Sequence, residues 1–63
     1  MEQTGTDSLA WLELRIARLV IHRQELRQAG ADERRLEANR MEIVSAQQAL
    51  SGLLIERHLR HAA

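Results

Sequence analysis

Several residue types that hold small proteins together are missing from this 63-residue chain. It has no cysteine, which excludes disulfides and zinc sites built from thiolates. It has no proline, and Trp11 is its only aromatic residue. At this length, the apolar area buried on folding roughly balances the conformational entropy that is lost. We therefore expect the chain to gain stability by association with another chain.

Lysine is also absent, and nine arginines balance nine acidic residues. A neutral chain has no bulk attraction to nucleic acid or anionic lipid, although a local basic face remains possible. No apolar run approaches the roughly 20 residues that cross a bilayer. The first residues lack the basic and apolar regions of a signal peptide. We expect a cytoplasmic protein without membrane contact.

The distribution of helix formers and turn residues predicts an all-α antiparallel hairpin with helices over about 8–29 and 33–60. Asp7 or Ser8 suits the start of the first helix, and Gly30 suits the left-handed residue that ends it. Asp32 suits the N-cap of the second helix. No stretch alternates between apolar and polar residues as a strand would. The chain is thus a single domain over 1–63, in which residues 1–6 are expected to be disordered.

Apolar residues on the two predicted helices show mirror symmetry about a midpoint next to Gly30. On each helix they step by three and four residues, which is the period of a coiled-coil stripe. Five mirrored pairs are apolar and form the predicted hairpin seam: Leu9/Leu53, Leu12/Leu50, Ile16/Ala46, Leu19/Ile43 and Leu26/Leu36. Val20 is expected on the same face.

A sixth mirrored pair, Arg23 and Asn39, is polar. A polar layer lowers stability but can fix register and partner number. One interpretation places the pair inside the seam as a register layer, with Glu37 and Glu42 near enough to reach the guanidinium. The other turns Arg23 outward into solvent.

Both helices have more apolar surface than one seam can cover. Ala10, Ala17, Met41 and Ala62 belong to this second stripe, and a helix that is apolar on two sides is buried on two sides. The predicted interface consists of Trp11, Leu14, Ile21, Val44, Ile55 and Leu59. Its occupant is either a second copy, which would complete a four-helix bundle, or an amphipathic helix of another protein.

The sequence has no residue pattern typical of a catalytic or metal-binding site. His58 and His61 share a helix face, but Leu59 follows Glu56 at the position where a di-iron bundle needs histidine. No nucleophile is placed beside a base, and no phosphate-binding loop is present. The sequence therefore predicts a non-enzymatic protein without metal, cofactor or small-molecule ligand.

Arg15, Arg18 and His22 form a basic arc beside the seam and are the candidate RNA face. Two copies would double this arc, whereas the alternative is a solvated flank balanced by Glu13 and Glu25. RNA recognition commonly uses aromatic stacking, and we expect no aromatic residue in the arc.

Two resemblances extend this interpretation. Length, hairpin topology and turn residues 31–33 (ADE) are similar to the Rop-like regulators of plasmid copy number, which implies a homodimeric four-helix bundle and, as the alternative function, RNA binding. Residues 22–30 (HRQELRQAG) and 46–54 (AQQALSGLL) resemble the two helices of small bacterial chaperones that hold needle subunits of type III secretion systems. This second resemblance implies a co-chaperone that covers apolar helix surface on its partners. The residues together predict a protein–protein interaction module: an adaptor, scaffold or small chaperone.

Overall fold

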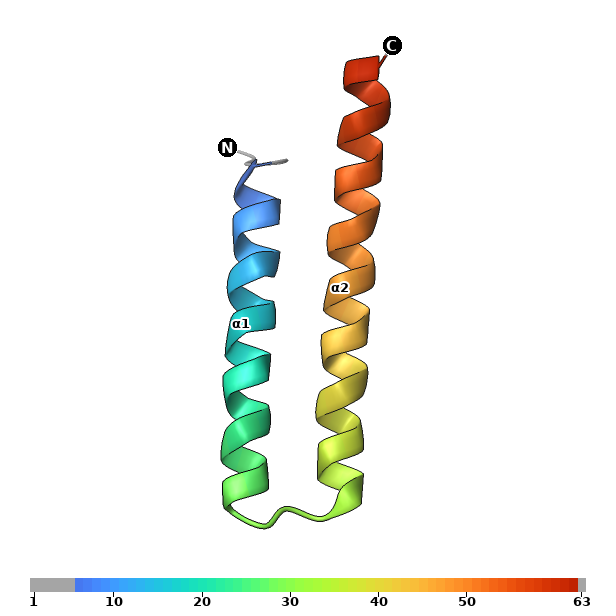
Figure 1. The fold of residues 1–63 in the computed structure, drawn as a ribbon. Helices are drawn as coiled ribbons and strands as arrows, with labels where there is room; N and C mark the ends of the chain where they lie inside the picture. Colours follow the sequence, from blue (N-terminus) through green and yellow to red (C-terminus); the bar gives the residue numbers. More distant parts are fainter. Residues whose placement is uncertain (1–5, 63) are drawn as a thin grey trace.

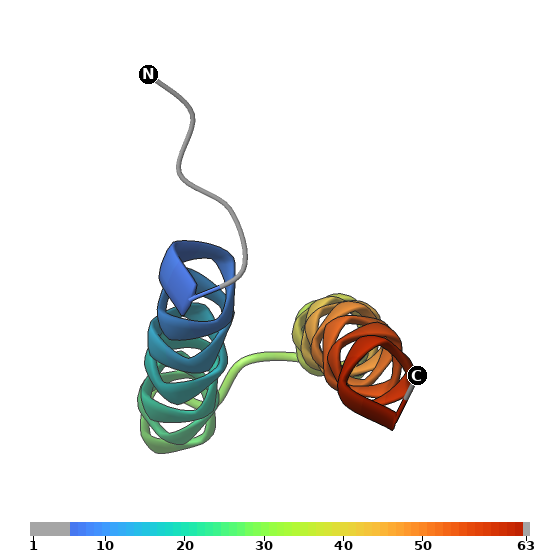
Figure 2. The ribbon, with the colours of Figure 1, turned by 90° about the horizontal axis from the view of Figure 1, so that it is seen from above.

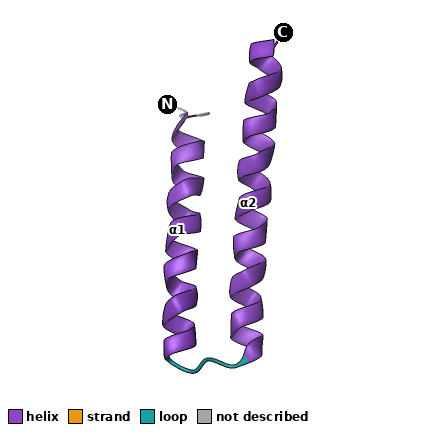
Figure 3. Cartoon of the chain, viewed as in Figure 1, coloured by secondary structure: helices purple, strands orange, loops and turns teal. Residues whose placement is uncertain are grey.

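The computed structural model describes residues 6–62, which form two antiparallel α-helices joined by a short turn (Figure 1). Helix α1 spans Thr6–Gln28 and helix α2 spans Glu33–Ala62. Residues 6–62 contain no strand (Figure 3). The predicted all-α hairpin is therefore confirmed.

Three of the four helix ends differ from the prediction by one or two residues, and α2 begins at Glu33 as predicted. Helix α1 begins at Thr6, so the predicted cap at Asp7 or Ser8 is wrong, because both residues lie inside the first turn. It ends at Gln28, and α2 continues to Ala62 because no glycine or proline stops it near residue 60. Residues 1–5, most of the segment expected to be disordered, lie outside the described residues.

The turn begins with a hydrogen-bonded end to α1. Gly30 has a φ of 74°, a left-handed conformation that glycine adopts without a steric cost. The N–H of Ala31 donates to the carbonyl of Leu26 at 2.9 Å, and the N–H of Gly30 donates to that of Arg27 at 3.1 Å. These two bonds form the Schellman motif, which satisfies carbonyl groups at the end of the helix.

Asp32 then begins α2. Its Oδ1 accepts a hydrogen bond of 3.0 Å from the N–H of Arg35, and its carbonyl accepts one of 3.2 Å from the N–H of Leu36. This is the expected geometry of an N-cap, and Glu33 adds a favourable negative charge to the first turn. The chain reversal is thus specified by residues within the turn.

The two helices pack along a narrow apolar seam. Its most buried hydrophobic residues are Leu12, Leu19 and Ala46, against which Ile16, Ile43, Leu50 and Leu53 pack. Leu9, Leu26 and Leu36 are half-buried. Every apolar residue of the mirrored pairs is thus at least half-buried. Val20 was wrongly expected on this face: it is 44% exposed, because one residue turns the helix by about 100° away from Leu19.

The molecule is elongated, with extents of 49 × 22 × 15 Å. Seen from above, the two helices stand side by side as a single layer (Figure 2). Helix α2 has 30 residues and α1 has 23, so α2 extends past the start of α1 at the end far from the turn (Figure 1). We call this the open end of the hairpin.

Candidate partner-binding surface

Five of the six residues predicted for the interface have exposed side chains. Their exposed fractions run from 49% for Leu14 to 62% for Leu59, and Trp11, Ile21 and Ile55 lie between these values. The sixth, Val44, is half-buried. The hairpin therefore leaves most of the predicted interface in solvent.

Three of these side chains, Leu14, Ile21 and Ile55, point away from the other helix of the hairpin. On α1, Leu14 and Ile21 each lie two residues from a buried seam leucine, and on α2, Ile55 lies two residues from Leu53. A step of two residues turns an α-helix by about 200°, so these side chains lie opposite the seam. The exposed apolar surface consequently lies on the two outer sides of the hairpin and does not form one shared face.

Sequence reasoning left three exposed residues out of the interface. Val20, Met41 and Leu54 are 44%, 52% and 49% exposed. Val20 and Leu54 each follow a seam leucine directly in the sequence, and such adjacent apolar pairs are the pattern that would have revealed them. Each pair has one member in the seam and one member turned toward solvent.

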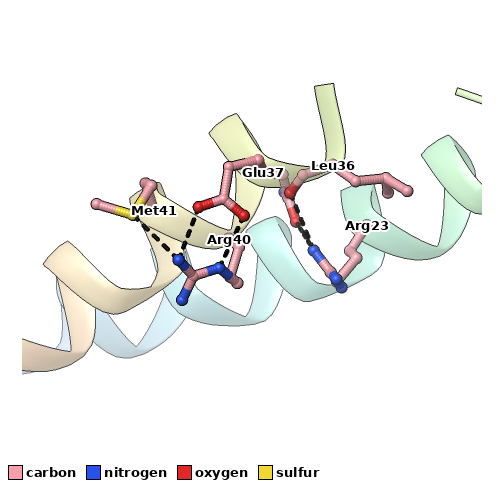
Figure 4. A network of polar contacts seen from close by, with 6 residues as sticks. Arg23, Leu36, Glu37, Arg40 and Met41 are labelled. Atoms are coloured by element: carbon pink, nitrogen blue, oxygen red, sulfur yellow. Dashed lines mark hydrogen bonds and ion pairs between the residues drawn. The ribbon is translucent and has the colours of Figure 1, made fainter. Parts of the chain in front are cut away.

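The polar layer is hydrogen-bonded inside the seam. Asn39 is only 2% exposed, and its Nδ2 donates to the carbonyl of Leu19 at 3.1 Å. The Arg23 guanidinium donates to the carbonyl of Leu36 at 3.1 Å (Figure 4). It also donates to Oδ1 of Asn39 at 3.3 Å. The interpretation that turns Arg23 into solvent is therefore wrong. Among the described side chains, no buried polar atom lacks a hydrogen-bond partner.

The two glutamates expected near Arg23 pair with other arginines. Glu37 accepts two hydrogen bonds from Arg40, at 3.0 and 2.7 Å (Figure 4), and Glu42 lies 3.6 Å from Arg15. The hydrogen bonds from Arg40 hold the pKa of the Glu37 carboxyl below its ordinary value. The same contact raises the pKa of Arg40.

The basic arc on α1 contains an aromatic neighbour that was not expected there. The guanidinium carbon of Arg15 lies over the Trp11 ring, 5.8 Å from the ring centroid, which is within the range of a cation–π contact. A shallow hollow of about 270 Å³ has six lining residues: Trp11, Leu14, Arg15, Arg18, Leu19 and His22. The i, i+4, i+7, i+11 spacing of Trp11, Arg15, Arg18 and His22 already placed them on one stripe of the helix. The expectation of an arc without an aromatic residue is therefore wrong.

No group of three or more histidine, aspartate or glutamate side chains in residues 6–62 is arranged to hold a metal ion. Neither described helix has a stretch long and apolar enough to cross a membrane. Comparisons of the chain with protein-family models, curated proteins and solved structures found no significant match.

Proposed function

We propose that this chain is a non-enzymatic protein–protein interaction module that presents apolar helix surface to a second copy or to another helical protein. One observation carries the proposal, namely the set of large hydrophobic side chains that the hairpin leaves exposed: Trp11, Leu14, Val20, Ile21, Met41, Leu54, Ile55 and Leu59. Exposed apolar surface of this extent is typical of interaction sites.

The balance between buried and exposed residues supports association. Only Leu12, Leu19 and Ala46 are buried hydrophobic residues among those described. Full burial of one further leucine, isoleucine or tryptophan contributes roughly 1.5–3 kcal/mol. Covering even a few of the outer residues would therefore change the stability of so small a chain substantially.

The position of this surface favours partners that contact the outer side of each helix. The resemblance of residues 22–30 and 46–54 to the needle-subunit chaperones favours a bacterial, cytoplasmic co-chaperone as the form of the proposal. In that role the hairpin would shield apolar helix surface of its partner, and the partner would shield the outer sides of the hairpin in return.

The mass of the protein in solution tests the proposal. Sedimentation at micromolar to submillimolar concentrations should show self-association, or a defined complex with a helical partner peptide. Leu14→Glu combined with Ile55→Glu should abolish association while circular dichroism shows that the helices persist. Gln47→Glu, at an exposed polar position, is the matched control. A folded monomer that binds no helical peptide at any concentration would contradict the proposal.

A dimeric RNA-binding regulator is the second candidate function. The observation that favours it is the Trp11 ring beside Arg15, because aromatic stacking and arginine contacts together bind single-stranded nucleic acid. Affinity for RNA that falls steeply with salt concentration would support this candidate. Retention of a protein partner at high salt would favour the first.

A further inference from the structure

We propose that the hollow lined by Trp11, Arg15, Arg18 and His22 binds an acidic amphipathic helix of another protein, with the partner's carboxylates on the arginines and its apolar stripe on Trp11 and Leu14. This inference rests on the proposed interaction function and names the chemistry of the partner. The lining residues extend over Trp11 to His22, about 17 Å along α1, which matches three turns of a bound helix.

The charge of the hollow selects an acidic partner. Its lining has two arginines and no acidic residue. Arg18 forms no ion pair with the other described side chains, and Glu42 holds Arg15 only at 3.6 Å, with both side chains about half exposed. Guanidinium groups prefer carboxylates, which they can bind through two parallel hydrogen bonds. The donors of Arg18 are therefore available to a partner's carboxylate.

Because the hollow also has an apolar part, the partner must present apolar side chains beside its carboxylates. Trp11 is 61% exposed and Leu14 is 49% exposed, and both line the hollow together with the buried Leu19. Tryptophan and arginine are enriched among the residues that contribute most binding energy at protein interfaces. A helix with leucines along one stripe and glutamates on its flank presents both chemistries at once.

A second copy of this chain fits the hollow less well. Four of the acidic side chains that it could offer already lie within 4 Å of a basic group of their own chain: Glu42/Arg15, Glu25/His22, Glu37/Arg40 and Glu56/Arg60. Nucleic acid also fits less well, because an arc with two arginines in a neutral chain makes few phosphate contacts. Nucleic acid would also leave the exposed Leu14 uncovered.

The test uses the full chain and three defined probes. The first is a helical peptide of about three heptads with a leucine stripe flanked by glutamates. The second has lysines in place of the glutamates, and the third is single-stranded oligouridine. Trp11 is the only tryptophan, so its fluorescence reports directly on the hollow. We expect the glutamate peptide to shift the emission to shorter wavelength and to bind at least tenfold more tightly than the lysine peptide.

Variants assign the effect to the arginines. Arg18→Glu should weaken binding of the glutamate peptide at least tenfold and strengthen binding of the lysine peptide. Arg18→Gln should weaken binding of the glutamate peptide by a smaller factor. Arg34→Glu makes the same change of charge at an exposed position in the first turn of α2, where glutamate is tolerated, and should bind as the unaltered chain does. Circular dichroism of each variant monitors the helices.

The other outcomes separate this inference from the proposed function. Equal binding of the two peptides would overturn the acidic selection and leave the interaction function standing. A dimer that binds neither peptide would overturn the foreign partner and make a second copy the occupant. Binding of oligouridine alone, or a monomer that binds no probe, would overturn both.

Discussion

The turn end and the open end of this hairpin differ in what stabilises them. At the turn, Gly30 and Asp32 satisfy the backbone groups of the two helix ends, and the buried Asn39 is hydrogen-bonded in the nearest polar layer. At the open end, the seam layers are apolar, and large hydrophobic side chains such as Trp11 and Ile55 lie outside the seam in solvent.

This difference separates folding from binding. The turn end is complete within one chain, because its donors and acceptors are satisfied by residues nearby in sequence or directly across the seam. The open end has apolar surface that one hairpin leaves uncovered. We therefore expect substitutions near the turn to change the fold, whereas substitutions on the outer sides of the open end should change association.

The largest expected effect distinguishes the two sides of α1 at the open end. Leu12 is 8% exposed within the seam, so Leu12→Ala should cost about 2–5 kcal/mol through lost burial and the cavity left behind. Leu14 is 49% exposed, so Leu14→Ala should lower the free energy of unfolding of the monomer by less than about 0.5 kcal/mol. Urea unfolding at low protein concentration measures both. Equal losses of unfolding free energy in the two variants would show that the outer side of α1 is already covered by other residues or by another chain.

The next effect concerns the polar layer. Replacing both Arg23 and Asn39 with leucine should raise stability by roughly 1–4 kcal/mol, because buried polar groups give way to apolar packing. Asn39→Leu alone should lower it by about 1–3 kcal/mol, because it removes bonds to Leu19 and Arg23 from a buried position. Thermal unfolding of the single and double variants measures the coupling.

A melting temperature that falls in the double variant would reverse this interpretation. It would show that the hydrogen bonds of Arg23 and Asn39 stabilise the turn end outright. If stability rises as expected, the amide spectrum of the double variant should show additional conformers, because an all-apolar seam no longer specifies one register.

Replacing a glycine by alanine should change the stability of the hairpin in opposite directions at the turn and toward the open end. Gly30→Ala should destabilise the hairpin by about 1–2 kcal/mol, because alanine is strained in the left-handed conformation that the turn requires. Gly52→Ala should stabilise it by about 0.5–1 kcal/mol, because alanine is the better helix former. An added Cβ meets no atom within 4 Å at either position, so both effects are due to the backbone. A stabilising Gly30→Ala would contradict the observed turn.

The features that sequence reasoning predicted are those encoded by local or periodic residues. Gly30 and Asp32 act through backbone groups a few residues away, so their identity was sufficient to place the turn. The steps of three and four residues between seam leucines define one helix face wherever a helix forms. The fold of the hairpin followed from these two kinds of pattern.

The features that sequence reasoning missed depend on side-chain direction across the hairpin. Whether Arg23 turns inward is decided by the carbonyl of Leu36, which comes within reach of the guanidinium only when the two helices pack. Trp11 was assigned to the outer stripe alone, although its position four residues before Arg15 also places it beside the basic arc. A residue between two faces belongs to both, and only packing decides which contact it makes.

The smallest expected effect lies on the exposed side of the turn half, in the Glu37–Arg40 contact. The pKa of Glu37 is lowered chiefly by the hydrogen bonds from Arg40; desolvation opposes this shift, and attraction to the charges of Arg40 and Arg23 lowers the pKa further. Because the folded pKa is lowered, the contact contributes above the ordinary carboxyl pKa and is lost as pH falls through the lowered value. Both side chains are solvated, so we expect no measurable change in unfolding.

The titration of the Glu37 carboxyl carbon by NMR is therefore the measurement that detects this contact. Arg40→Gln should raise the midpoint toward the ordinary value, while Arg60→Gln, which removes a separate pair with Glu56, should leave it unchanged. An unchanged midpoint in Arg40→Gln would show that water replaces the guanidinium in solution. In that case the Glu37–Arg40 pair would contribute nothing to the turn half, which would sharpen the contrast between the hydrogen-bonded seam and the solvated surface around it.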